Sequence, residues 1–339
     1  MLVGVVLLAC LGIAVVIIAF GRGSSRELLA QHIAAVNARH ALPPAENAAT
    51  IYDRLVAGVT LVGNLPDPNL TPAAYSALME ASRIESCWLG LSPGEQCYRD
   101  HVRRMRPMRQ WARALASAAT RDAAGGHVDA AVEKLHCLIR MGSHLQQQGL
   151  LLDFGTGTAI EMQAWSSLGE SVMRPDAAEE LLRMAEAMPW ELEGDCEEAV
   201  KLMREVVPLI AETVLAEWTL RERLRNWWLT RGEKSEEEII QLFYQRLLSV
   251  RRGTRLLVAL RRYHNANGRW PDSLDEIRTF VPDQALIDPF TEQTLVYKKE
   301  ADGQFVLYSK GPNGRDDNGV RGGKADDYRI WPRYGIKAP

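Results

Sequence analysis

The sequence predicts a mainly α-helical protein with an N-terminal transmembrane helix, an α-helical bundle as its body and a small C-terminal α+β domain. Three observations predict this class: an uncharged apolar run at the N-terminus, about two hundred residues of helical periodicity, and a change near residue 294 to a short β pattern rich in glycine and aspartate. The chain has 339 residues, 47% of them hydrophobic, which is enough for one sizeable core and a smaller one. Its formal charge of −3 gives no overall attraction to nucleic acid, so we expect no such partner.

The apolar run predicts a membrane anchor over residues 1–21. The segment from Leu2 to Phe20 carries no charge, and a helix of this length at about 1.5 Å per residue spans roughly the 30 Å of a bilayer core. A cleavable signal peptide is the alternative, because Ala19-Phe20-Gly21 resembles its cleavage site. The run is longer than the roughly 7 to 15 apolar residues of such a peptide, so the sequence favours a single-pass membrane protein.

Two signals disagree about the side of the membrane on which the body lies. Basic residues follow the apolar run and none precedes it, a distribution that keeps a body in the cytoplasm. Cysteines indicate the opposite side: the body contains Cys87, Cys97, Cys137 and Cys196, an even number that suits an oxidising compartment. We expect a periplasmic or extracytoplasmic body, in which Cys87 and Cys97 flank a turn that allows them to pair and Cys137 and Cys196 form the other candidate pair.

The body is predicted to contain a connector and a helical domain. Residues 22–49 form a juxtamembrane connector in which two consecutive prolines interrupt any helix, and residues 50–234 form the α-helical domain. Asn47 is placed to cap the first helix of this domain, and Thr71 followed by proline predicts the start of another. Residues 114–145 combine small side chains, a Gly-Gly turn and a second helical pattern, as in one tetratricopeptide-like hairpin. Because a solenoid needs about three such units, we expect a bundle.

Ser235 and Glu238 form a capping box, which predicts a helix that runs to about Tyr263 and joins the body to the C-terminal domain. This domain is predicted to cover residues 235–332, and residues 333–339 form a tail.

The C-terminal domain contains a series of short motifs in a specific order. In chain order these are Tyr263-x4-Gly268-x-Trp270-Pro271, Asp288-Pro289-Phe290, Tyr308-Ser309-x-Gly311-x-Asn313-Gly314, and an acidic loop that leads to Trp331. The series resembles the globular domain of the major pseudopilins of type II secretion systems. The resemblance covers about a quarter of the chain and implies an α+β fold with a short antiparallel sheet. The whole chain is also similar to uncharacterised bacterial proteins that place a membrane anchor and a helical region before such a module.

The resemblance implies a structural calcium ion in the loop between the last strands. The implied ligands are Lys310, Asn313, Asp316, Asp317, Asp326 and Asp327. Calcium requires several carboxylate and backbone carbonyl oxygens, which a loop of this composition contains. The loop departs from the family in two places: Asn313 replaces an aspartate, and Asp326 and Asp327 are adjacent where the family has Asp-x-Asp. We therefore expect weaker binding than a full carboxylate set gives.

A solvated turn is the alternative to a calcium site. Its Asp and Asn side chains would bond to nearby backbone groups, and Arg315, Arg321 and Lys324 would neutralise the carboxylates without a metal.

The resemblance does not extend to the N-terminus. Pseudopilins have a basic leader, a glycine cleavage site before Phe or Met, and a glutamate five residues into the apolar helix. Here Gly4 and Gly12 precede aliphatic residues and the apolar run has no glutamate. We expect a protein that is not itself a pilin subunit.

A search for catalytic motifs identifies no catalytic residue. The seven histidines occur without the spacing of a metal site, and Gly155-Thr-Gly-Thr158 lacks the lysine of a phosphate loop. We expect a non-enzymatic cell-envelope protein with an interaction or assembly role, a membrane and other envelope proteins as its partners, and calcium as its cofactor. The alternative is an envelope enzyme of unknown reaction whose site lies in the helical domain.

Overall fold

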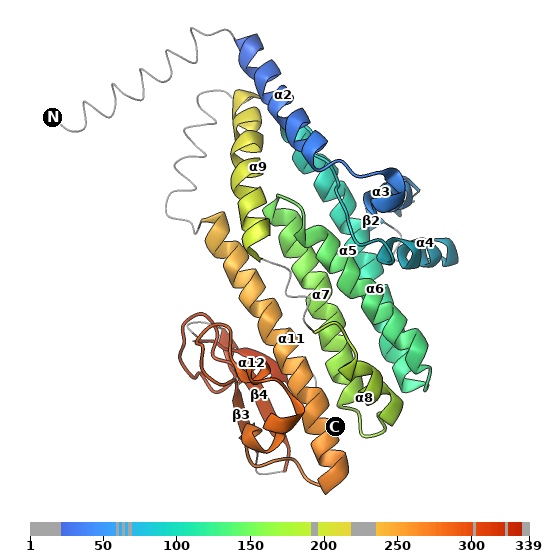
Figure 1. Ribbon diagram of the computed structural model, residues 1–339, viewed down its shortest axis with the longest axis vertical. Helices are drawn as coiled ribbons and strands as arrows, with labels where there is room; N and C mark the ends of the chain where they lie inside the picture. The colour runs from blue at the N-terminus through green and yellow to red at the C-terminus, as the bar shows by residue number, and fades with distance from the viewer. Residues whose placement is uncertain are drawn as a thin grey trace, which may run out of the picture.

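The computed structural model describes residues 22–58, 61–62, 65–66, 70–190, 196–217, 235–300, 303–322 and 325–333. Helices form an elongated bundle, and a small antiparallel sheet packs beside one of them (Figure 1). The predicted class, mainly helical with a small antiparallel sheet, is confirmed. None of the helices within these ranges is long and apolar enough to cross a membrane, and the predicted anchor at residues 1–21 lies outside them.

The body consists of helices and a short β-hairpin. In chain order these elements are α2 (Arg22–Arg39), η1 (Pro44–Glu46), α3 (Ala49–Ala57), the strands β1 (Leu61–Val62) and β2 (Leu65–Pro66), α4 (Pro72–Ser82), α5 (Glu95–Ala124), α6 (Val128–Gln146), α7 (Leu151–Val172), α8 (Glu179–Glu186) and α9 (Cys196–Glu217). The sequence shows no strand pattern before residue 294, so the hairpin of β1 and β2 was not expected. Strands of two residues are too short to show alternation of apolar and polar side chains. Helix α9 lies beside α2, far from it in sequence (Figure 1).

Local capping signals begin helices where the sequence predicts. Thr71 accepts a hydrogen bond from the backbone N–H of Ala74 at the start of α4. Asn47 makes more hydrogen bonds than the simple helix cap that the sequence predicts. Its side-chain oxygen accepts the N–H of Ala49 at 3.1 Å and that of Trp88 at 2.9 Å, and its amide donates to the Trp88 carbonyl at 3.1 Å. Asn47 therefore joins the start of α3 to the chain segment around Trp88.

The predicted hairpin is formed by α5 and α6, and α7 returns against both. Two glycines face each other where α6 and α7 cross. A Cβ atom at Gly157 would lie 2.5 Å from the carbonyl oxygen of Gly142, and one at Gly142 would lie 2.8 Å from that of Gly157. Because no side chain fits between the two backbones, glycine at both positions lets these helices approach closely. The glycine and threonine segment at residues 155–158 is helical, and its other glycine, Gly155, faces the ring of Phe243 on α11.

Helix α11 (Glu236–Asn267) belongs to both parts of the molecule. Ser235 and Glu238 form the predicted capping box at its start, with both reciprocal hydrogen bonds present. Its residues Leu247 and Val250 lie in the core of the body, whereas Leu260 and Tyr263 lie in the core of the C-terminal domain. Helix α11 therefore joins the two parts, as expected from the sequence.

The C-terminal domain packs a sheet and two short helices against α11. After α11 come η2 (Leu274–Phe280), α12 (Asp283–Leu286), β3 (Val296–Lys299), β4 (Phe305–Ser309), β5 (Arg321–Gly322), β6 (Ala325–Asp326) and β7 (Tyr328–Trp331). Strand β4 lies between β3 and β7 and is antiparallel to both. All five of its residues are buried: Phe305 and Leu307 pack in the core with α11, Tyr308 bonds to Asp316 of the loop between β4 and β7, and Ser309 bonds to Asp288. That loop contains the small β5–β6 hairpin and all six predicted calcium ligands.

The cysteines described by the structure are not paired. Cys87, Cys97 and Cys137 are buried free thiols, so the bridge between Cys87 and Cys97 that the sequence left open is not formed. The side chain of Cys196 lies outside the described part of the chain. Cysteine pairing at residues 87 and 97 therefore no longer supports an oxidising compartment.

The glycine contact between α6 and α7 predicts the effect of a single methyl group. At an ordinary helical site, Gly→Ala stabilises a protein by roughly 0.5–1 kcal/mol, because it restricts the unfolded chain. At Gly157 we expect the opposite sign and a loss of about 1–3 kcal/mol, because the two helices must move apart. Urea unfolding of Gly157→Ala and of a control, Ala159→Ser on the exposed side of α7, measures the difference. A Gly157→Ala variant more stable than the parent would show that the helices are not held this closely.

Candidate functional site

The loop between β4 and β7 gathers three of its predicted ligands through hydrogen bonds. The Asn313 amide donates to Asp317 Oδ2 at 2.9 Å, and the backbone N–H of Asp326 donates to the same oxygen at 3.3 Å. The backbone N–H of Asn313 approaches Asp326 Oδ1 at 3.4 Å. Asn313, Asp317 and Asp326 are thereby held together, although Asp326 follows Asn313 by 13 positions and Asp317 by 9.

Asp327 follows Asp326 and is fully buried. Its Oδ2 accepts the backbone N–H of Gly319 at 2.7 Å, whereas its Oδ1 is buried without a hydrogen-bond partner in the described chain. Burial raises the pKa of the Asp327 carboxyl, and the nearby charge of Asp317 adds to this, against the opposing effect of the backbone N–H groups of Gly319 and Asp317. A buried carboxylate oxygen without a donor is costly, and a bound cation would remove that cost.

Asp316 and Lys310 attach the loop to the domain in a different way. Asp316 accepts hydrogen bonds from the Tyr308 hydroxyl at 2.6 Å and from Lys298 Nζ at 2.9 Å. The Tyr308 hydrogen bond lowers the pKa of Asp316 to about 2, and the contact with Lys298 contributes in the same direction. The backbone N–H of Lys310 donates to Asp288 Oδ2 at 2.9 Å, so the predicted motif residue Asp288 orients the start of the loop.

A close backbone contact shapes the loop. A Cβ atom at Gly311 would lie 2.2 Å from the backbone oxygen of Asp326, and Gly311 has a positive φ of 64°. Only glycine fits this position without a shift of the backbone. The two ends of the loop are thereby brought together, which places the side chains of Asn313 and Asp326 next to each other.

The basic residues of the loop do not neutralise these carboxylates in the described structure. No ion pair there joins Arg315 or Arg321 to an acidic side chain, and Arg321 lies over the ring of Tyr328 at 5.9 Å. Lys324 lies outside the described residues.

No three His, Cys, Asp or Glu side chains in the described ranges converge on a metal position by themselves. An ion here would therefore need amide and backbone carbonyl oxygens in addition to carboxylates, which is the ligand mixture of calcium.

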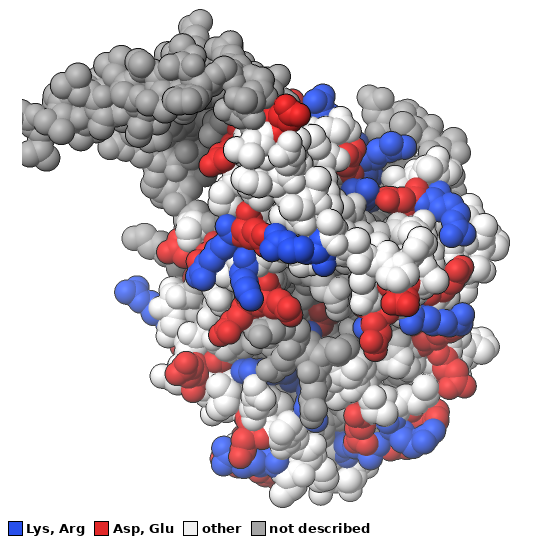
Figure 2. Space-filling model, turned by 45° about the horizontal axis from the view of Figure 1, so that its top comes forward, with Lys and Arg blue, Asp and Glu red and all other residues white. Residues whose placement is uncertain are grey.

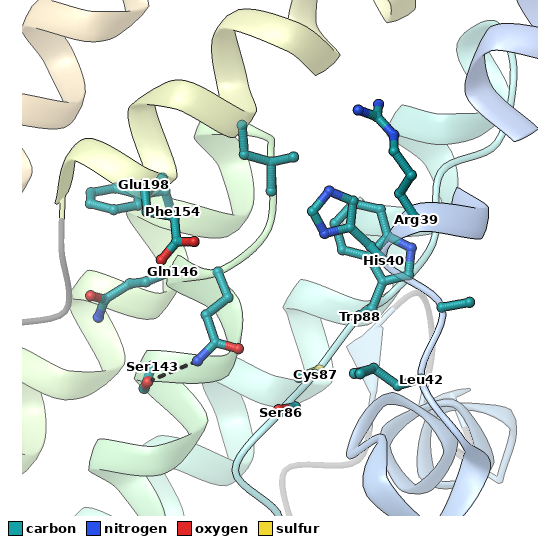
Figure 3. A pocket seen from close by; sticks show the side chains of 14 residues that line it. Arg39, His40, Leu42, Ser86, Cys87, Trp88, Ser143, Gln146, Phe154 and Glu198 are labelled. Atoms are coloured by element: carbon teal, nitrogen blue, oxygen red, sulfur yellow. Dashed lines mark hydrogen bonds between the residues drawn. The ribbon is translucent and has the colours of Figure 1, made fainter. Parts of the chain in front are cut away.

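The helical body contains a separate cavity of about 450 Å³ (Figure 3). His40 stacks on Trp88 with ring centroids 4.7 Å apart on one wall, and Phe154 and Glu198 lie on the opposite wall. Cys87 also lines it, and burial raises the pKa of its thiol far above the ordinary value. A thiol held in its neutral form is a poor nucleophile, so Cys87 is not activated as one in this cavity.

A buried ion pair inside the body was not expected from the sequence. His101 Nδ1 lies 2.6 Å from Asp153 Oδ2, and both side chains are almost completely buried. Burial acts to lower the pKa of His101, but the hydrogen bonds that its ring makes to Asp153 and Cys97 outweigh it and raise the pKa to about 10. The pair therefore joins α5 to α7 as a charged contact. His101 and Asp153 are far apart in sequence, so only their packing reveals the pair.

Surface charge does not distinguish one partner class by itself. Acidic and basic side chains are intermixed on the face of the molecule seen in Figure 2, in agreement with the small net charge of −3. No known protein family matches this chain, and neither a curated protein nor a solved structure is significantly similar to it. The candidate site therefore depends on the geometry of its own residues.

Replacing Asp327 with asparagine is expected to stabilise the full chain at pH 7 in the presence of a chelator. The raised pKa of Asp327 means that folding favours its protonated form. This contribution to stability is complete below the ordinary pKa of about 3.9 and is lost as the pH rises through the raised value. Asparagine keeps an oxygen for the Gly319 N–H and carries no charge.

Thermal unfolding at pH 7 with EDTA measures this effect. Glu300→Gln, an exposed carboxylate in the same domain, is the control and should change little. A lower melting temperature for Asp327→Asn than for the parent would contradict the raised pKa.

Proposed function

We propose that this protein is a single-pass, membrane-anchored component of the cell envelope with an interaction or assembly role. In this proposal residues 1–21 hold the helical body at the membrane on its extracytoplasmic side, and a calcium-stabilised, pseudopilin-like C-terminal domain forms part of the surface that partners contact. The protein is not itself a pilin subunit, because the apolar run lacks the glutamate of that family. The order of anchor, bundle and terminal module supports a role in holding a domain near the membrane.

The observation that carries the calcium proposal is the buried, unpartnered Oδ1 of Asp327. Beside it are Asp317 and Asp326, whose carboxylates make no ion pair in the described chain. Asp317, Asp326 and Asp327 would hold the ion together with Asn313 and backbone carbonyls of the loop. The ion would supply the positive charge that these carboxylates lack and would fix the loop between the last two strands.

The architecture of the C-terminal domain supports the pseudopilin-like proposal. A long helix is followed by a three-stranded antiparallel sheet, and the acidic loop lies between the last two strands of that sheet. This is the arrangement that the resemblance implies. The likeness concerns this domain only and implies nothing about the function of the helical body.

Calcium is expected to stabilise the full chain in a way that depends on Asp327. An ion that binds only the folded loop, present at one hundred times its dissociation constant, adds about 2.7 kcal/mol to the free energy of unfolding. Thermal unfolding in calcium and in EDTA measures the shift, with magnesium as a test of size selectivity. Asp327→Asn should abolish the calcium shift and Glu300→Gln should keep it. An identical melting temperature of the parent in calcium and in EDTA would remove the calcium proposal.

The interaction role is tested with the full chain in its membrane. A tagged chain is expected to remain in membranes after alkaline extraction, and the same chain without residues 2–20 is expected to be released. Solubilised in detergent, the tagged chain should recover the same envelope proteins in repeated purifications, with lower yield in EDTA. Release of the full chain by alkali, or purifications without a reproducible companion in calcium and in EDTA, would contradict the proposal.

A further inference from the structure

An open groove of about 600 Å³ lies where the body meets the end of the C-terminal domain. Helices α5 and α7 form two of its sides, and Tyr328 and Arg333 close the third. Three arginines, Arg113, Arg121 and Arg333, line the groove together with the hydroxyl groups of Ser117, Ser166 and Ser167. This combination of guanidinium and hydroxyl groups is suited to an anionic ligand with further hydrogen-bonding groups.

The charge of the groove is positive. Glu170 is the one acidic residue among the described residues that line it, and it pairs with Arg333 at 2.7 Å. Arg121 donates to the Ser117 hydroxyl at 2.8 Å, so its charge is not neutralised by that contact. Arg113 makes no ion pair within the described part of the chain. Two guanidinium groups therefore remain available for carboxylates.

We propose that this groove binds an acidic peptide segment of a partner protein. Arginine forms two parallel hydrogen bonds with a carboxylate, which suits glutamate and aspartate side chains. Ser166, Ser167 and Gln163 supply donors and acceptors for the backbone of such a segment, and Met162 supplies apolar contact. The proposal rests on the interaction role described above and names the chemistry of the partner.

The acidic loop leads directly into the strand that forms one wall of the groove. Tyr328 directly follows Asp327, and Arg333 lies just beyond the end of β7. A loop fixed by calcium would hold the start of β7, and thus this wall of the groove, in place. We expect the peptide to bind more tightly in calcium than in EDTA, while the arginines of α5 and the hydroxyl groups remain in both conditions.

Helix α5 also contains a matched control for the groove arginines. Arg103 and Arg109 are exposed on the same helix, make no ion pair in the described structure and do not line the groove. Replacing them changes the net charge by the same amount as replacing Arg113 and Arg121. A difference between the two pairs therefore reports the groove and not the overall charge.

The test is a fluorescence polarisation titration of the full chain in detergent with a labelled hexaglutamate peptide. Because both substitutions remove a charge-assisted hydrogen bond to the peptide, Arg113→Gln with Arg121→Gln is expected to weaken binding at least about tenfold. Arg103→Gln with Arg109→Gln should weaken it by less than about threefold. A hexaglutamine peptide should not bind. Circular dichroism of each variant verifies that these exposed substitutions leave the fold intact.

Three results would overturn the proposal. These are an equal loss of affinity in both double variants, no binding of hexaglutamate by the parent, and tighter binding of a polyphosphate or of anionic lipid vesicles than of the peptide. Melting curves of the same samples in calcium and in EDTA show whether calcium binds, independently of whether the peptide binds. Peptide binding with the expected arginine dependence would support the groove even if membranes contain no partner and the interaction role fails.

Discussion

The arrangement of the molecule depends on a row of buried polar contacts between α7 and α11. Arg251 pairs with Glu161, Thr254 donates to the Trp165 carbonyl at 3.1 Å, and Arg261 donates to the Val172 carbonyl at 3.0 Å. Breaking one buried ion pair of this kind costs about 3–5 kcal/mol, because the remaining charge is left without a partner. These contacts require a specific register between the two helices, since each polar group must meet its own partner. The C-terminal domain is carried by α11, so its position on the body follows from this row.

Both candidate surfaces depend on that position. The groove is formed by α5, α7 and the end of β7. It exists because α11 holds β7 next to the body. The acidic loop lies on the other side of β4, where Tyr308 and Lys298 hold Asp316 against the sheet. A change in the register of α7 and α11 would move the β7 wall of the groove away from α5 and α7. Strand β7 connects the two surfaces, because Asp327 directly precedes it and its residue Tyr328 lines the groove.

Sequence reasoning identified the features that arise from neighbours along the chain. The capping box at Ser235, the cap at Thr71 and the hairpin of α5 and α6 need only local hydrogen bonds and a turn, and the structure contains them. The His101–Asp153 and Arg251–Glu161 pairs were missed, because the partners are brought together only by packing. Asn47 shows the intermediate case: its local cap was expected, whereas its bonds to Trp88 arise from tertiary structure.

The shared helix has a consequence for how this protein loses its structure. A boundary at residue 235 assigns α11 to the C-terminal domain, yet Leu247 and Val250 of this helix fill the core of the body. Neither core is complete without α11, so heat or denaturant should dissolve both in a single cooperative transition. For the same reason the terminal module cannot be transplanted by cutting the chain before α11, because the severed helix would expose the apolar side chains that the body normally covers.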